Sequence, residues 1–333
     1  MRSGALDGRT LLALVAAAAL VPSIAWAQRA EGSFQRTLNV SGQAEIDIVS
    51  GSGRIEVRQG SAGRIEISAR VLASDSWGWN RRFQLSPEER VRRIEANPPI
   101  EQNAGVVRIG YITSDELRDG VAISYVVTVP PHSSLKSKTG SGSQDLTGVD
   151  GSVVASTGSG SLTISRVGAD LHASTGSGSI DATSVGGAFH ATTGSGSIAA
   201  TEVRGAITAK TGSGRIDVTQ TGSGNVEVSS GSGSVRLRGV RGAVHASTSS
   251  GGMTIAGDLS GDWDLSATSG SVTVDLPASQ GFELDARTSS GRIDVNAPLT
   301  VSGSIDRRSL RGTVRGGGPL LHVRTASGGI SVR

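Results

Sequence analysis

The sequence predicts an all-β protein, a right-handed β-solenoid built from coils of about 18 residues. One observation is a phrase, Thr-Gly-Ser-Gly, that recurs in register. A second is an apolar-polar-apolar triplet after each phrase, and a third is a similar triplet before it. Fixed self-similarity indicates stacked repeats, and alternation with period two indicates strands with one buried face. The serines of the phrase lie 18 residues apart at Ser141, Ser159, Ser177, Ser195 and Ser213.

The first 27 residues have the pattern of an export signal. Arg2 and Arg9 precede the apolar run 11–21, and Ala25-Trp26-Ala27 offers small residues at a cleavage site. The run is too short for a comfortable membrane span, although an uncleaved anchor remains an alternative. We therefore expect cleavage after Ala27, no integral membrane span in the mature chain, and a protein exported to the periplasm or the cell surface.

Residues 28–131 are expected to form an irregular N-terminal β segment that caps the solenoid. Strand-like alternation covers 44–69, 105–112 and 121–131. Between these strands, Ser86 has the features of an N-cap, with Pro87 at the first helical position and Glu89 completing a capping box. The sequence thus predicts one inserted helix over about 86–96. Such a segment would cover an open sheet edge, which otherwise recruits other strands.

Residues 132–333 are expected to form the regular solenoid. Triplets such as 180–182 predict one wall, and triplets such as 171–173 predict the opposite wall. Two further phrase serines follow at steps of 10 and 9, which makes half a coil a structural unit. Glycine is expected to supply positive φ at the corners and serine to bond local backbone. Recurrent alanine and 3% aromatic residues suggest walls too close for large rings. The chain ends on a repeat strand at Val332, so we expect that edge to be less protected.

The composition excludes several classes of function. The chain has 48 Gly and no Cys, so disulfides, thiolate metal sites, a lipid-modified cysteine and a cysteine nucleophile are impossible. Despite a pI of about 9.8, 32 basic residues are offset by 29 acidic ones, and no basic stretch interleaved with aromatics predicts a nucleic-acid partner. Neither a G-x-S-x-G nucleophile motif nor a phosphate-binding loop is present. We expect no enzyme activity and no cofactor.

The first candidate site is an outward column on one wall, five residues before each phrase serine. Four of the five histidines fall in it, and His172 and His190 occupy adjacent coils. Adjacent imidazoles could share a transition metal or titrate together, and the alternative is a solvated polar ladder. The members are Lys136, Val154, His172, His190, Thr208, His245, Asp264, Asp285 and His322.

The second candidate is an arginine and tryptophan cluster at the inserted helix. Its candidate binding residues are Arg90, Arg92, Arg93, Trp77 and Trp79. It could engage anionic envelope polymer or lipid headgroups. The alternative is an amphipathic cap that packs its apolar residues on the end of the solenoid.

The stretch 121–162 carries a family resemblance. A strand ending in Val-Pro is followed by alternating S-G-S and G-V-x-G units. This pattern is similar to a bacterial putative adhesin family of exported proteins with repeated β-strands, and the resemblance covers about residues 34–333. It implies a location in the cell envelope and a role in adhesion or envelope stress, and the family has no shared catalytic motif.

Together these observations predict an exported, non-enzymatic envelope or surface protein, an adhesin or scaffold. The expected partners are envelope glycans, an anionic lipid surface or other envelope proteins. The alternative is a β-helix carbohydrate-active enzyme, a polysaccharide lyase or glycosidase, with carboxylates and arginine gathered on one wall. Its candidate residues are Asp217, Glu227, Arg236 and Asp294.

Overall fold

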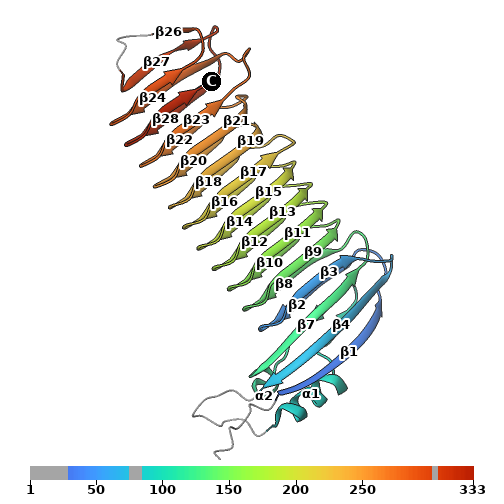
Figure 1. Cartoon of the computed structure of the whole chain (residues 1–333). Coiled ribbons are helices and arrows are strands. Elements are labelled where there is room, and N and C mark those ends of the chain that lie inside the picture. The colour runs from blue at the N-terminus through green and yellow to red at the C-terminus, as the bar shows by residue number, and fades with distance from the viewer. Residues whose placement is uncertain (1–28, 75–84, 302–306) are drawn as a thin grey trace, which may run out of the picture.

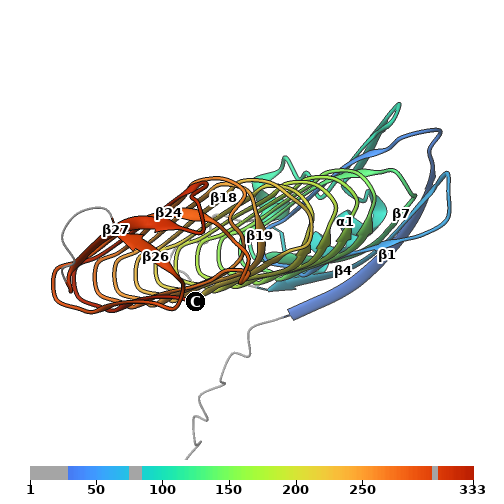
Figure 2. The same ribbon diagram turned by 90° about the horizontal axis from the view of Figure 1, so that it is seen from above.

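The computed structural model describes residues 29–74, 85–301 and 307–333, which form a long stack of coils between two facing sheets. Figure 1 shows the stack from the side, and Figure 2 shows the coils as a row of flattened loops around a narrow interior. The chain alternates between the sheets, so neighbours within a sheet are mostly two strands apart in sequence. The predicted β-solenoid is confirmed. Within the described ranges, no helix is both long and apolar enough to cross a membrane.

The two sheets run nearly the whole length of the molecule. Sheet A contains β9 (Gln144–Val149), β11 (Leu162–Val167), β13 (Ile180–Val185), β15 (Ile198–Val203), β17 (Ile216–Gln220), β19 (Val235–Arg241), β21 (Met253–Asp258), β23 (Val272–Asp275), β29 (Ile330–Val332) and β25 (Ile293–Val295) in spatial order. Sheet B contains β8 (Ser134–Thr139), β10 (Val153–Thr157), β12 (Leu171–Thr175), β14 (Phe189–Thr193), β16 (Ile207–Thr211), β18 (Val226–Ser230), β20 (Val244–Thr248), β22 (Trp263–Ala267), β28 (Leu320–Thr325), β24 (Phe282–Thr288), β27 (Ser309–Val314) and β26 (Leu299–Val301).

The pairing register confirms the repeat length. Leu162 pairs with Ile180 in sheet A, 18 residues further on, and both walls keep this step through several coils. Ile207 pairs with Val226, so one coil there has 19 residues. The half-step phrase 221–224 lies at the opposite corner, between β17 and β18. Half a coil is therefore one wall and one corner.

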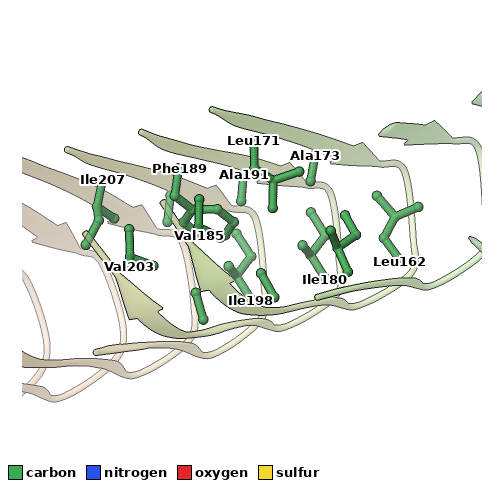
Figure 3. Packing of buried hydrophobic residues seen from close by; sticks show 14 of the residues in the cluster. Leu162, Leu171, Ala173, Ile180, Val185, Phe189, Ala191, Ile198, Val203 and Ile207 are labelled. Atoms are coloured by element: carbon green, nitrogen blue, oxygen red, sulfur yellow. The ribbon is translucent and has the colours of Figure 1, made fainter. Parts of the chain in front are cut away.

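The core is the thin space between the walls. Leu171 and Phe189 from sheet B face Ile180 and Ile198 from sheet A, as Figure 3 shows, and all are at most 1% exposed. Burying each such side chain contributes about 1.5–3 kcal/mol. The expectation that the walls lie too close for large rings was wrong, because Trp263 is also fully buried in the same column as Phe189. Only the neighbouring column of sheet B is dominated by alanine.

Threonine, the first residue of the repeated phrase, holds one of the two corners in several coils. The Thr193 hydroxyl donates to the carbonyl of Gly178 in the preceding coil at 2.9 Å, and it accepts from the amide of Gly196 at 3.1 Å. Neither Gly194 nor Gly196 has positive φ, so the expected reason for these glycines was wrong. An added Cβ at Gly196 would lie 1.8 Å from the Gly178 carbonyl oxygen. Close stacking of successive corners therefore requires these glycines.

The N-terminal segment closes one end of the stack. Its elements are β1 (Arg29–Asn39), β2 (Glu45–Ser50), β3 (Ile55–Gln59), β4 (Arg64–Ser74), α1 (Pro87–Ala96), β5 (Ile100–Asn103), β6 (Val106–Ile109), α2 (Asp115–Arg118) and β7 (Val121–Val129). The strands β2 and β3 form a coil that pairs directly with β8 and β9. Beyond this coil, β7, β4 and β1 extend sheet A, while β6 and β5 extend sheet B.

The predicted helix is present as α1. The Ser86 hydroxyl accepts from the amide of Glu89 at 3.2 Å, as an N-cap should. Val91 and Ile94 are buried, and the Glu95 carboxylate accepts from the amide of Ser33 on β1 at 2.7 Å. The helix therefore covers the end strands. The second helix, α2, was not predicted.

The C-terminal coil lies inside the stack, which corrects the expectation of a poorly protected edge at Val332. Strand β28 pairs with β22 on one side and β24 on the other, and β29 lies between β23 and β25. Figure 1 places the C-terminus below the outermost strands. Insertion satisfies backbone groups on both edges of the last coil. The actual edges, β25 and β26, have 3 residues each, and short edges resist unwanted pairing.

Candidate functional site

The outward column predicted on one wall exists on sheet B. Strand pairing brings its members together from coil to coil, in an order that differs from the sequence near the C-terminus, because His322 lies between Asp264 and Asp285. The pairing also adds four residues that were not predicted as members of the column. The spatial order is Arg108, Asp47, Lys136, Val154, His172, His190, Thr208, Glu227, His245, Asp264, His322, Asp285 and Arg311.

Acids and imidazoles alternate in the second half of this column. The Asp264 carboxylate lies between two imidazoles, 3.6 Å from His245 Nδ1 and 3.7 Å from His322 Nδ1. Glu227 lies beside His245 and accepts from Lys210 Nζ at 2.6 Å. This hydrogen bond lowers the pKa of the Glu227 carboxyl from its ordinary value. The column is therefore a ladder of mixed charge with little net sign.

The two adjacent histidines stack on each other. The rings of His172 and His190 are nearly parallel, with centroids 4.5 Å apart and an interplanar angle of 8°. Imidazole lone pairs lie in the ring plane, so the lone pairs of two stacked rings do not converge on one ion at the roughly 2.0–2.1 Å that zinc requires. Within 29–74, 85–301 and 307–333, no three His, Asp or Glu side chains form a group suited to a metal.

The arginines of α1 differ in their surroundings. Arg90 is only 3% exposed and donates to the carbonyls of Ser74 and Asp119, so it joins parts of the cap. Arg92 and Arg93 are exposed and lie near Glu89, at 3.7 and 3.0 Å. Trp77 and Trp79 lie outside the described residues.

The residues considered for a carbohydrate-active enzyme are not assembled. Asp217 lies on β17 of sheet A, where its carboxylate pairs with Arg236 at 3.4 Å and Arg238 at 2.8 Å. Asp294 lies on β25 at the far end of that sheet, and Glu227 lies on sheet B. The geometry does not bring these carboxylates to one place, so they cannot act as a pair on one glycosidic bond.

Some of the functional residues that the sequence analysis missed could have been found from the sequence. Glu227 lies five residues before Ser232, so the rule that placed the histidines also places it. Asp47 and Arg108 join the column only through the cap strands, whose register no repeat reveals. A groove at the corners that follow sheet A, lined in part by Arg166, Ser184 and Glu202, had no signal in the sequence.

The fold and the surface together define the class of protein. It is a β-solenoid whose two walls are sheets of mostly parallel strands, with outward side chains in register from coil to coil. The model of one family, Toastrack DUF4097, matches residues 166–333, or 168 of the 333 residues. The chain belongs to this family.

Two solved structures are similar to the chain. One is a putative cell adhesion protein from Clostridium sporogenes ATCC 15579, with 11% identity over 90% of this chain and 99% of that one and a TM-score of 0.23. The other is a putative adhesin from Bacteroides fragilis NCTC 9343, with 12% identity over 91% and 97% and a TM-score of 0.23. No curated protein matches the sequence, and none of the comparisons identifies an enzyme family.

Proposed function

We propose that this chain is an exported, non-enzymatic protein of the cell envelope or surface that binds a repetitive partner through many weak contacts. The observation that carries the proposal is the in-register column on sheet B, which repeats an outward polar side chain at nearly every coil. Strands in a sheet are about 4.8 Å apart, so the column offers contacts at a short, constant interval. Envelope glycans and anionic lipid surfaces present repeated polar groups of the kind such a column would meet.

Export is supported by the sequence of residues 1–27, which lie outside the described residues. A basic start, a short apolar run and Ala25-Trp26-Ala27 are typical of a cleaved signal. Fractionation of cells that carry a C-terminally tagged chain tests this part. The tag should leave the cytoplasm, and the recovered chain should begin at Gln28.

The physical basis is multivalency. A solvent-exposed ion pair contributes about 0–1 kcal/mol, so no single rung of the ladder holds a partner. Contacts on one rigid wall add with little further loss of freedom once the first has formed, and the total affinity then exceeds that of any rung. A surface of this kind needs neither a deep pocket nor a cofactor.

The experiment measures binding and cleavage together. The chain from Gln28 is sedimented with insoluble envelope polysaccharide and with anionic vesicles, and soluble sugar ends are assayed afterwards. Lys136→Ala, Glu227→Ala and Asp264→Ala should each weaken binding by about threefold or less. The triple variant should weaken it by more than about tenfold.

The matched control places the same net charge change on sheet A, with Asp145→Ala, Asp181→Ala and Arg236→Ala combined. This control should bind like the wild type. Equal losses in the two triple variants would show that no ladder is recognised. Release of soluble oligosaccharide would instead support the carbohydrate-active enzyme.

A further inference from the structure

A groove of about 640 Å³ lies at the corners that follow β9, β11, β13, β15 and β17, apart from the ladder on sheet B. Gly168 and Gly186 are among the residues that line it. An added Cβ at either glycine would lie within 2.4 Å of a carbonyl oxygen of the preceding coil. Asp150 and Arg204 lie on the coils that flank these glycines. The groove therefore runs along the stack, across successive coils.

Three residues that line the groove have a disfavoured backbone conformation. Arg166, Ser184 and Glu202 have φ of 54°, 58° and 59° and occupy equivalent positions on adjacent strands of sheet A. Gly148 has the same position one coil earlier, with φ of 73°. Glycine tolerates this conformation, whereas arginine, serine and glutamate rarely adopt it. Strained residues of this kind cluster at binding sites.

The acidic side chains of the groove have hydrogen-bond partners, whereas its two arginine side chains have none within the residues that the structure describes. The Glu202 carboxylate accepts a hydrogen bond from the Ser184 hydroxyl, and the Asp150 carboxylate accepts one from the amide of His132 at 3.4 Å. Arg166 and Arg204 form no ion pair or side-chain hydrogen bond with any residue in the described part of the chain. The acids thus have partners and the guanidinium groups do not. The two guanidinium groups are therefore available to a ligand, and guanidinium matches a carboxylate with two parallel hydrogen bonds.

We propose that this groove binds an extended acidic glycan, whose carboxylates pair with Arg166 and Arg204 and whose hydroxyls bond Glu202 and Ser184. The inference goes beyond the proposed function, because the groove lies apart from the ladder on sheet B. The two arginines lie two coils apart, or about 10 Å along the stack. A sugar unit in an extended chain is similar in length to one coil spacing, so carboxylates on alternate units fall near the two guanidinium groups.

The test uses oligogalacturonides of defined length as the probe and measures affinity by calorimetry with the chain from Gln28. Wild type should bind, and affinity should rise with oligomer length until the groove is filled. The double variant Arg166→Gly/Arg204→Ala should bind at least tenfold more weakly. Arg166→Gly alone should also raise the melting temperature, since glycine relieves the strained φ. A merely structural role for Arg166 would not give lost binding with gained stability.

The control is Arg215→Ala/Arg292→Ala, which removes the same charge from exposed positions outside the groove and should bind like wild type. The inference is overturned by no binding by wild type, by equal affinity of the groove variant and wild type, or by an equal loss in the control. Neutral oligosaccharides and polyphosphate of similar length should bind more weakly than the acidic glycan, and a preference for polyphosphate would also overturn it. A negative result in this calorimetric test does not change the sedimentation test, which measures binding of envelope polysaccharide through sheet B. The two proposals therefore fail separately.

Discussion

At the scale of single residues, a buried hydroxyl at one corner links most successive coils, although Ala267 takes this position on β22. The Thr193 hydroxyl uses both of its hydrogen-bonding roles, toward a carbonyl of one coil and an amide of its own corner. The same pair of bonds recurs at Thr157, Thr175 and Thr211. A buried carbonyl or amide without a hydrogen-bond partner costs free energy. The hydroxyl bonds one of each, so it is needed even though the interior is apolar.

The substitution Thr193→Val should therefore destabilise the protein. Valine keeps the shape of threonine but leaves the Gly178 carbonyl and the Gly196 amide without these partners, which costs about 1–3 kcal/mol. Chemical denaturation followed by circular dichroism measures the change in unfolding free energy. Thr192→Val is the control, because Thr192 is the exposed neighbour on the same strand. Equal unfolding free energies for the two variants would contradict the role of the hydroxyl.

Sequence reasoning reached the direction of side chains but not the conformation of the backbone. Alternation placed Ile180 inside and His172 outside, and both placements are confirmed. The positive φ of Arg166 was invisible, because it arises where one residue remains unpaired between two matched pairs of neighbouring strands. The corner glycines were correctly predicted to be necessary. The predicted reason was their backbone conformation, whereas the structure shows a steric reason. Distances between coils decide such points, and a repeat pattern does not contain them.

At the scale of elements, the cap shows which local signals suffice. Ser86 and Pro87 predicted where α1 begins, because capping depends on residues adjacent in sequence. The burial of Arg90 was not predictable, since its carbonyl acceptors belong to Ser74 and Asp119, on segments distant in sequence. An arginine on a charged helix therefore looked like part of a binding surface, although its guanidinium holds the end of β4 and the turn after α2.

A matched pair of substitutions on α1 tests whether Arg90 is structural and Arg92 is not. Arg90→Leu should lower the unfolding free energy by about 2 kcal/mol or more, because it removes charge-assisted hydrogen bonds to two carbonyls. Arg92→Leu should have an effect within about 0.5 kcal/mol, since this side chain is 78% exposed. Thermal unfolding of both variants, alongside wild type, measures the difference. A stable Arg90→Leu variant would mean that the cap does not depend on this arginine.

At the scale of the whole molecule, the order of coils is a property that repeats conceal. Each strand of sheet B presents nearly the same face to its neighbours, so the sequence does not distinguish β24 from β28 as the partner of β22. The structure places β28 there and moves β24 one position outward. The Thr325 hydroxyl continues the corner bonds by donating to the Gly270 carbonyl at 3.0 Å. Spatial order, and not sequence order, therefore maintains the stack.

Paired cysteines distinguish the two orders, because the natural chain has no cysteine. Ser266 pairs with Arg324 across β22 and β28, whereas Arg287 lies one strand further out. Disulfides require Cα atoms about 4.4–6.8 Å apart, a range that includes neighbouring strands and excludes strands about 10 Å apart. Mild oxidation should therefore cross-link Ser266→Cys/Arg324→Cys but not Ser266→Cys/Arg287→Cys, as measured by mass spectrometry of peptides. Ser247→Cys/Ser266→Cys, across β20 and β22, is the positive control. Cross-linking of the second pair in place of the first would restore sequence order and return the C-terminal coil to the edge of the stack.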